Sequence, residues 1–356
     1  MKPPVLKNLL IVAALLGMLA SIMFAAFTYY LHRPLPLDDT TLIEVPAGST
    51  LNAVARQLHQ QGYLEFPAGF ILWTRLNGLE RQLKPGEYEL QPGLTPDTLV
   101  GLLVSGKNKQ YALTLVEGWT FRQALAAIGR QEKIRTTLVN PTDTELLALF
   151  EENDAVLSAI PFLEGSLLPE TYFYTAGTRD LDILRRAHLA LRQTLKAEWA
   201  TRLGALPYDN PWQALILASI IEKESSINAE KAQIAGVFVR RLELGMRLQS
   251  DPTVIYGLGP EYAGVIRTSD LQSAHVWNTY RNNGLPPTPI ALSSQQSLHA
   301  SLNPAAGSSL YFVADGNGGH VFSDTLEAHN AAVQRYRQQR AAGSGQVSDS
   351  SVGNGH

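Results

Sequence analysis

The chain has 356 residues, of which 45% are hydrophobic and 17% charged, a balance typical of folded protein and enough for about two domains with their own cores. Its formal net charge of −3 provides no bulk positive field, which excludes nucleic acid as a main partner. The chain has no cysteine, so disulfides, thiolate metal sites and thiol nucleophiles are excluded as well.

The first predicted element is a membrane-spanning helix. From Leu9 to Leu31 no residue is charged, and at about 1.5 Å per residue a helix of this length reaches ~35 Å, enough to cross a bilayer core. A cleaved signal peptide is the alternative, but the run is longer than the apolar region of a signal peptide and no small-x-small cleavage site follows it. Residues 1–32 are therefore predicted to form a cytoplasmic N-terminus and a retained transmembrane anchor, with residues 9–31 in the lipid bilayer.

Charges on either side of this helix predict its orientation. Lys2 and Lys7 precede it and Asp38 and Asp39 follow it, and positive charge favours the cytoplasmic side. We therefore expect a single-pass protein of the cytoplasmic membrane, with its N-terminus inside and its body outside the cytoplasm. The proline-containing residues 33–41 are predicted to be a short, stiff linker.

Residues 42–108 are predicted to be a small α/β module. A strand and a turn lead into a helix whose one face holds Leu51, Val54, Ala55 and Leu58, and a second helix, a strand and a third helix capped near Thr95 follow. The GSTL turn at 48–51 resembles the turn that opens a LysM glycan-binding domain. The module is therefore predicted to be LysM-like, and its role is either glycan binding or that of a structural spacer.

Residues 109–342 are predicted to be a larger, mostly helical domain, which makes the fold class α+β. The stretch 180–203 repeats apolar residues at helical spacing, and SLYFVADGNGGHVF predicts a short β-hairpin around a Gly-rich turn. Asp324 and Glu327 have the spacing of a capping box for the closing helix. The polar residues 343–356 are predicted to be a disordered tail.

Two carboxylates end an apolar helix in this domain. Glu222 and Glu224 follow an uncharged run in ALILASIIEKESS, and two helical steps place them about 200° apart, so they cannot act as a close pair. Either one, poorly solvated among apolar neighbours, would have a raised pKa, the condition for a general acid near neutral pH. The alternative is that the helix reaches the surface here and both charges are solvated.

Two polar loops with aromatic residues, within 236–259 and 277–290, follow this helix. Their candidate ligand-binding residues are Gln249, Asp251, Thr253, Tyr256, Asn278 and Tyr280. Amide, carboxylate, hydroxyl and aromatic groups together are typical of a saccharide cleft, where they bind hydroxyl and acetamido groups and stack on sugar rings. Each residue alone also has a structural interpretation as a turn, cap or core residue.

Five ordered blocks resemble a known family. EGSLLPETY (164–172), ASIIEKES, RLQSDPTVIYG, NTYRNNGLPPTPI and LYFVADGNGGHVFS are closely similar to the YceG-like (MltG) family of endolytic murein transglycosylases. The resemblance covers nearly everything except the tail. It implies an inner-membrane enzyme with a lysozyme-like catalytic domain in the periplasm, which cuts within peptidoglycan glycan strands, leaves 1,6-anhydro-N-acetylmuramic acid ends, and terminates or trims nascent strands.

The resemblance also implies a catalytic residue, Glu224, because it is the second glutamate of the family's E-K-E triplet. Glu224 would protonate the glycosidic oxygen between N-acetylmuramic acid and N-acetylglucosamine, and would then accept the proton of the muramyl C6 hydroxyl as that oxygen attacks C1. A muramidase-type hydrolase, the alternative reaction, would need a second carboxylate, about 5 Å away in a retaining enzyme and across a wider gap that holds water in an inverting one. Asp251 is the nearest candidate by motif.

The remaining site predictions concern binding. The residues predicted to position the substrate are Gln249, Asp251, Thr253, Tyr256, Asn278, Tyr280 and Glu164. Glu222 is predicted to be structural, paired with a Lys or Arg on its helix face. His320 and His329 have no third ligand at useful spacing, so we predict no metal, and no cofactor is expected.

Two rival functions stay open from the sequence. One is a non-catalytic, membrane-anchored peptidoglycan-binding scaffold. The other is a cytosolic pyridoxal phosphate-dependent aminodeoxychorismate lyase, against which the predicted anchor argues. Peptidoglycan glycan strands are the expected partner, and association with peptidoglycan synthases is a hypothesis motivated by topology and substrate alone.

Overall fold

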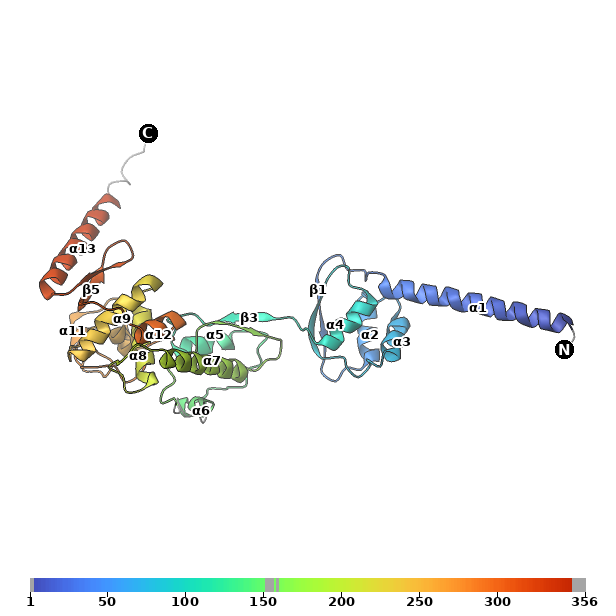
Figure 1. Ribbon diagram of the computed structural model, residues 1–356, viewed down its shortest axis with the longest axis horizontal. Coiled ribbons are helices and arrows are strands. Elements are labelled where there is room, and N and C mark those ends of the chain that lie inside the picture. The colour runs from blue at the N-terminus through green and yellow to red at the C-terminus, as the bar shows by residue number, and fades with distance from the viewer. Residues whose placement is uncertain (1–2, 151–156, 158–159, 348–356) are drawn as a thin grey trace, which may run out of the picture. The chain divides into compact units, whose positions relative to one another are not determined.

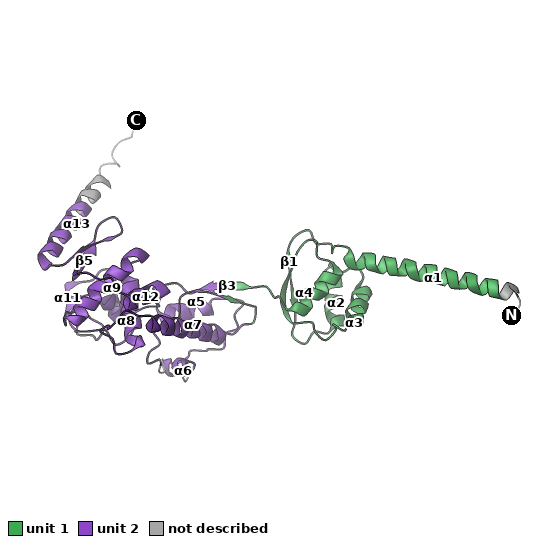
Figure 2. Ribbon diagram, in the orientation of Figure 1, with its two compact units in different colours: residues 1–111, 173–177 green, residues 112–172, 178–356 purple. Residues whose placement is uncertain are grey.

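The computed structural model describes residues 3–150, 157 and 160–347. It divides into two compact units, residues 1–111 with 173–177 and residues 112–172 with 178–356 (Figure 2). Both units combine helices with short strands, which confirms the mixture of helices and strands in the predicted α+β class.

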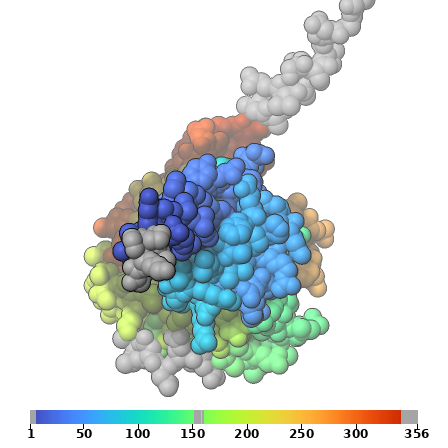
Figure 3. All heavy atoms as spheres, turned by 90° about the vertical axis from the view of Figure 1, so that its right-hand side faces the viewer, coloured from blue at the N-terminus to red at the C-terminus, as the bar shows by residue number. Residues whose placement is uncertain are grey.

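The first unit begins with helix α1, Pro3–His32, of which Leu6–His32 is long and apolar enough to cross a membrane. It is the one such helix in the described part of the chain. Figure 1 shows α1, in blue, projecting from the rest of its unit, and Figure 3 shows the same helix, in dark blue, from its N-terminal end. Leu16, Met18 and Phe24 are 60%, 64% and 70% exposed, an arrangement that water disfavours and a lipid bilayer favours.

The rest of this unit is a small module with one core. Its elements are β1 (Thr41–Val45), α2 (Leu51–Gln60), α3 (Pro67–Leu76), β2 (Gly86–Leu90) and α4 (Pro96–Ser105). The two strands pair antiparallel, with Ile43 opposite Tyr88. Both of these side chains are buried with the apolar faces of the helices, which gives the module a core of its own.

Local signals explain where these helices begin. The Thr50 hydroxyl accepts a hydrogen bond from the Ala53 N–H at the start of α2, and the Thr95 hydroxyl accepts one from the Thr98 N–H at the start of α4. The predicted apolar face of α2 is confirmed, because Leu51, Val54, Ala55 and Leu58 are all buried.

The second unit is mostly helical. Its elements before the hairpin are β3 (Tyr111–Thr114), α5 (Phe121–Gly129), α6 (Asp143–Ala148), β4 (Thr171–Tyr174), α7 (Asp180–Ala200), α8 (Pro211–Glu224), α9 (Asn228–Glu243), α10 (Asp251–Leu258), the 3-10 turn Gly259–Glu261, α11 (Thr268–Gln272) and α12 (Gln295–Leu302). Strands β3 and β4 form a two-stranded sheet, and the residues of β3 from 112 and of β4 up to 172 belong to this unit. Helix α8 is central, since it packs against α7, α9, α10 and α12. The Asn210 side chain caps it and Pro211 occupies its first turn.

The predicted hairpin is confirmed. Strands β5 (Tyr311–Ala314) and β6 (His320–Ser323) pair antiparallel, and α13 (Leu326–Val347) packs on both of them. The predicted capping box is wrong, because the Thr325 hydroxyl accepts the Ala328 N–H. Asp324 instead accepts hydrogen bonds from two serine hydroxyls before β5.

Helix α13 also enters the segment that was predicted to be a polar tail. Residues 343–347 are helical, and residues 348–356 of that prediction lie outside the described residues.

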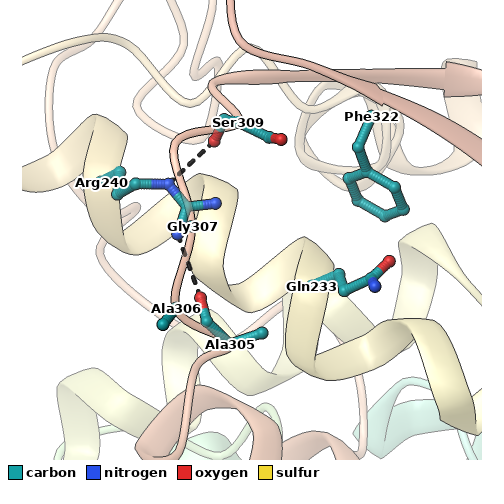
Figure 4. A pocket seen from close by; sticks show the side chains of 7 residues that line it. All are labelled: Gln233, Arg240, Ala305, Ala306, Gly307, Ser309 and Phe322. Carbon is teal, nitrogen blue, oxygen red and sulfur yellow. Dashed lines mark hydrogen bonds between the residues drawn. The ribbon is translucent and has the colours of Figure 1, made fainter.

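Arg240 of α9 holds the segment of chain that leads into the hairpin. Its Nε donates to the Ser309 carbonyl at 2.9 Å and its Nη1 to the Ala305 carbonyl at 3.1 Å, beside a cavity of about 160 Å³ that Phe322 also lines (Figure 4). Gly236 permits this approach, because a Cβ there would lie 2.5 Å from the Ala305 carbonyl oxygen. The residues from Ala305 to Ser309, just before the hairpin, are thus held on α9.

Candidate active site

Glu224 is the last residue of α8 and lines a cavity of about 590 Å³. Every residue of the helix from Trp212 to Ile221 is buried except Gln213, so α8 is fixed in the core and brings Glu224 to the cavity at its end. Gln249, Asp251 and Tyr280 line the same cavity. The structure therefore brings together four of the residues predicted from the sequence.

The carboxyl of Glu224 has a single described hydrogen-bond donor, the Ser250 hydroxyl. Ser250 is itself buried, and its N–H donates to the Thr279 hydroxyl at 3.0 Å. Loss of solvent raises the pKa of Glu224 from 4.5 to about 7, and the nearby Asp251 charge also raises it, while the Ser250 hydrogen bond, His320 and Arg241 oppose the shift. At this pKa the group can both donate and accept a proton near neutral pH.

Asp251 is the second carboxylate of the cavity. It is exposed at the start of α10, and its Oδ1 accepts a 2.6 Å hydrogen bond from the Tyr280 hydroxyl. Burial, followed by the contact with Asp251, raises the pKa of the Tyr280 hydroxyl, so it remains a donor. The two side chains together present a charged, hydrogen-bonding rim beside Glu224.

Gln249 reaches the cavity through unusual backbone geometry. Its φ of 51° lies in the left-handed region, which a residue with a side chain rarely occupies. Its N–H donates to the Thr279 carbonyl at 3.2 Å, next to the bond from Ser250 to the same residue. These two hydrogen bonds to Thr279 fix the turn that carries Gln249 and Ser250, and Ser250 in turn donates to Glu224 at the end of α8.

Two of the predicted substrate residues, Thr253 and Asn278, are fully buried and do not line this cavity. The Thr253 hydroxyl donates to the Ser250 carbonyl at 2.7 Å. Asn278 donates to the Ser273 carbonyl at 2.7 Å and accepts from the Tyr280 N–H at 3.0 Å. Both side chains hold the loops that carry Ser250 and Tyr280, which is a positioning role.

Glu164 and Tyr256 form a separate cluster outside the residues that line the Glu224 cavity. The Glu164 carboxylate accepts from the Phe121 N–H at 2.8 Å, from the Gly165 N–H at 3.2 Å and from the Tyr256 hydroxyl at 3.2 Å. Burial raises the pKa of Glu164, and these hydrogen bonds oppose the shift. Tyr256 also packs edge-on against Trp277 at 5.5 Å between ring centroids. These contacts tie the start of α5 to α10.

Glu222 lies on the other side of α8 and contacts a different set of residues, as the helix geometry predicts. Its carboxylate accepts from the Lys231 ammonium at 3.2 Å, the Ser294 N–H at 2.9 Å and the Ser297 hydroxyl at 2.6 Å. Burial alone would raise the pKa of Glu222, but the serine hydrogen bonds and Lys231 outweigh it and keep the pKa below its usual value. The predicted structural role is supported, although its cationic partner comes from α9 and not from its own helix.

Residues that were not predicted from the sequence also belong to this site. Among them are Ser250, which donates to Glu224, and Arg241 and Tyr311, which line the cavity. Arg241 donates from Nε to the Leu310 carbonyl at 2.7 Å and from Nη1 to the Leu248 carbonyl at 2.8 Å, and its guanidinium lies 5.2 Å from the Tyr311 ring centroid. Ser250 lies between Gln249 and Asp251 in the sequence, and this position was the one signal that could have pointed to it as a site residue. The hairpin reaches the cavity only through tertiary packing.

The two histidines considered as metal ligands have other contacts. His320 Nδ1 pairs with the Glu230 carboxylate at 2.7 Å, and the His329 ring stacks on Tyr311 at 5.3 Å. Within the described residues no group of three or more His, Cys, Asp or Glu side chains has the arrangement of a metal site.

A carboxyl with a pKa near 7, set in a polar-aromatic cavity large enough for sugar rings, is typical of proteins that act on glycans by general acid–base chemistry. The sequence model of the YceG-like family matches residues 43–335. The chain therefore belongs to the YceG-like family.

Relatives found by sequence agree with this assignment. The endolytic murein transglycosylase of Bacillus subtilis (strain 168) is 32% identical over 330 residues, which cover 87% of this chain and 90% of that protein. The endolytic murein transglycosylase of Streptococcus pneumoniae serotype 2 is 25% identical over 352 residues, which cover 90% of this chain and 63% of that longer protein. A 2.6 Å crystal structure of a YceG-like protein from Listeria monocytogenes has 30% identity, covers 82% of this chain and 99% of that one, and superimposes with a TM-score of 0.49.

Proposed function

We propose that this protein is an endolytic peptidoglycan lytic transglycosylase, which cleaves the β-1,4 bond between N-acetylmuramic acid and N-acetylglucosamine within glycan strands. The observation that carries the proposal is Glu224, a partly buried carboxyl with a pKa of about 7 in a cavity of about 590 Å³. The names of the Bacillus subtilis and Streptococcus pneumoniae relatives supply the substrate and the reaction.

The reaction needs one group that first gives and then takes a proton. Protonated Glu224 donates its proton to the glycosidic oxygen as the C1–O bond breaks, and N-acetylglucosamine leaves with a free 4-hydroxyl. The Glu224 carboxylate then accepts the proton of the muramyl C6 hydroxyl while that oxygen bonds to C1, which closes the 1,6-anhydro ring and restores the acid. The Ser250 hydroxyl holds the carboxyl in position through both steps.

Asp251 is the candidate second carboxylate for the alternative reaction, hydrolysis. Its Oδ1 is already bonded to Tyr280 and the side chain is exposed, which favours substrate positioning over activation of a water. We therefore assign Gln249, Asp251 and Tyr280 to the sugar units on either side of the cleaved bond. Ordinary reducing ends in the products would favour a muramidase-type hydrolase instead.

The location and the domain types belong to the same proposal. Helix α1 is proposed as a retained anchor with the N-terminus inside, so that the second unit meets peptidoglycan in the periplasm. Residues 42–108 are proposed as a LysM-like module and residues 109–342 as a lysozyme-like catalytic domain. In this setting the enzyme would terminate or trim nascent strands, and peptidoglycan synthases would be natural neighbours.

The proposal is tested with the full chain in detergent, incubated with uncrosslinked glycan strands whose product ends are read by mass spectrometry. Internal fragments with anhydro ends are expected from the wild type. The Glu224→Gln variant should lose about 10²- to 10⁴-fold in rate, the usual contribution of general acid–base catalysis. Glu261→Gln, at an exposed glutamate outside the cavity, is the matched control and should cut normally.

Each other outcome points elsewhere. Equal activity of the Glu224→Gln variant would remove Glu224 from the chemistry. Intact strands with every variant, together with binding of the strands, would favour a non-catalytic peptidoglycan-binding scaffold.

A further inference from the structure

One wall of the Glu224 cavity comes from helix α13, close to the end of the chain. Leu326, His329, Asn330, Val333 and Arg337 all line it, and their spacing of three, one, three and four residues puts them on one helical face. Nothing in the proposed chemistry uses these side chains. They therefore face the place where a glycan strand would lie without taking part in bond cleavage.

The position of this face is fixed by the hairpin. The buried Ala332 anchors α13, and the His329 ring stacks on Tyr311 at an interplanar angle of 24°. The Arg241 guanidinium lies 5.2 Å from the centroid of the same Tyr311 ring. Burial, and secondarily Arg241, lower the pKa of His329, so its ring is neutral near physiological pH. The face of α13 is thus a packed wall.

The two arginines of the cavity differ in what they can still bind. Arg241 is buried and donates to the Leu310, Leu248 and Arg247 carbonyls. Arg337 is exposed, and the structure gives it no hydrogen-bond or ion-pair partner among the described residues. Arg337 is therefore the cavity's available cation, three helical turns from the first residue of the wall.

The chemistry of the substrate says what such a cation would meet. The sugars of the strand are neutral, with hydroxyl and acetamido groups, whereas the peptide attached to the lactyl group of each muramic acid carries carboxylates. An arginine binds a carboxylate with paired, charge-assisted hydrogen bonds. Arg337 also lies just beyond residue 335, where the match to the family ends.

We propose that the inner face of α13 is a specificity wall on which Arg337 binds a carboxylate of the stem peptide. The inference rests on the proposed function and adds its substrate class: strands with acidic, uncapped stem peptides are preferred over strands of the same length whose peptides are neutral.

The test compares one glycan preparation in two forms, with its stem-peptide carboxylates free or converted to carboxamides. The full chain in detergent should cut the free-carboxylate form with a kcat/KM about three- to tenfold higher, the range expected for an exposed but oriented Arg–carboxylate contact. Arg337→Gln should bring this ratio close to one, mainly through KM, and Arg337→Lys should retain part of it. Arg340→Gln is the matched control, because Arg340 belongs to the same helix, stacks on Tyr336 and does not line the cavity.

A ratio near one for the wild type, or a ratio that Arg337→Gln leaves unchanged, would overturn the proposal. Binding of both preparations to the Glu224→Gln protein, measured by calorimetry, gives the same comparison without turnover. Wild-type protein that binds the acidic form preferentially but cuts neither would contradict the proposed reaction and leave the specificity wall standing. Circular dichroism of each variant checks that α13 is still folded.

Discussion

At the scale of single residues, the site depends on the environment of one carboxyl. Glu224 loses solvent at the end of a buried helix, which raises its pKa, and Ser250 and Asp251 adjust that pKa in opposite directions. A glutamate with the ordinary pKa of 4.5 would be almost fully ionised at pH 7. The two neighbours therefore give a direct way to test whether the environment of Glu224 controls the rate.

The first prediction concerns the pH dependence of kcat/KM. The Ser250 hydrogen bond lowers the pKa of Glu224, so Ser250→Ala should move the alkaline limb of the profile to higher pH. The Asp251 charge raises that pKa, so Asp251→Asn should move the limb to lower pH, in both cases by about one unit or less. Turnover of glycan strands between pH 5 and 9 measures the alkaline limb for each variant. Shifts in the same direction would show that Glu224 is not the titrating acid, and Ser269→Ala, at an exposed serine, should leave the profile in place.

The second prediction concerns stability. The folded pKa of Glu224, about 7, lies above its unfolded value of 4.5, so the charged form is disfavoured in the fold. Wild-type stability attributable to this group is complete below pH 4.5 and is lost as the pH rises through 7. Glu224→Gln cannot ionise, so its stability relative to wild type should rise between pH 5 and pH 8. The expected rise in the difference in unfolding free energy is on the order of 1–3 kcal/mol, and it should appear as a rising Tm difference. A Tm difference that stays constant across this range would contradict the raised pKa.

At the scale of elements, the end of α8 is held by a buried ion pair on the side opposite the cavity. The Lys231 and Glu222 side chains are 2% and 6% exposed, and the serines at the start of α12 complete the hydrogen bonds of the carboxylate. This cluster joins α8, α9 and α12, and so fixes the helix that carries Glu224.

The third prediction tests this cluster. Lys231→Met leaves the Glu222 charge buried without its cation and should lower the free energy of unfolding by about 3 kcal/mol or more, as is usual when one partner of a buried pair is removed. Glu222→Gln combined with Lys231→Met should recover part of that loss. Lys223→Met, at the neighbouring exposed lysine, should change stability by no more than about 0.5 kcal/mol. Denaturant titrations compare the four proteins, and equal losses at Lys223 and Lys231 would refute the role of the pair.

Local patterns predicted several elements and failed where tertiary contacts decide. The apolar face of α2, the Thr95 cap and the β5–β6 hairpin follow from spacing within short segments, and the structure has all three. The opposite directions of Glu222 and Glu224 follow from helix rotation alone. A polar residue in a loop, however, is equally suited to a cavity or to a buried bond with backbone, and only packing shows that Asn278 is of the second kind.

The helix α13 shows the same limit more strongly. Its sequence is polar, and the local pattern predicts only that a closing helix is followed by a tail. Its place in the Glu224 cavity depends on the hairpin that carries it and on the Tyr311–His329 stack, which joins residues from two separate elements. No periodicity within one segment contains that information.

At the scale of the whole molecule, the fate of α1 decides where the reaction takes place. A retained anchor with the N-terminus inside would confine the enzyme to the outer face of the cytoplasmic membrane, whereas cleavage after α1 would release it. Both readings agree with an apolar N-terminal helix, so composition alone does not separate them.

The last prediction separates them by site-directed labelling, for which the chain is well suited because it has no native cysteine. Single cysteines are introduced as Lys2→Cys and Glu261→Cys, and intact cells are treated with a maleimide that cannot cross the cytoplasmic membrane. We expect Glu261→Cys to react in intact cells, because its side chain is exposed in the second unit, and Lys2→Cys to react only after the membrane is permeabilised. Reaction of Lys2→Cys in intact cells would reverse the orientation, and a protein whose mass lacks residues 1–32 would show that α1 is a cleaved signal sequence. In that case the substrate would have to reach a freely diffusing enzyme.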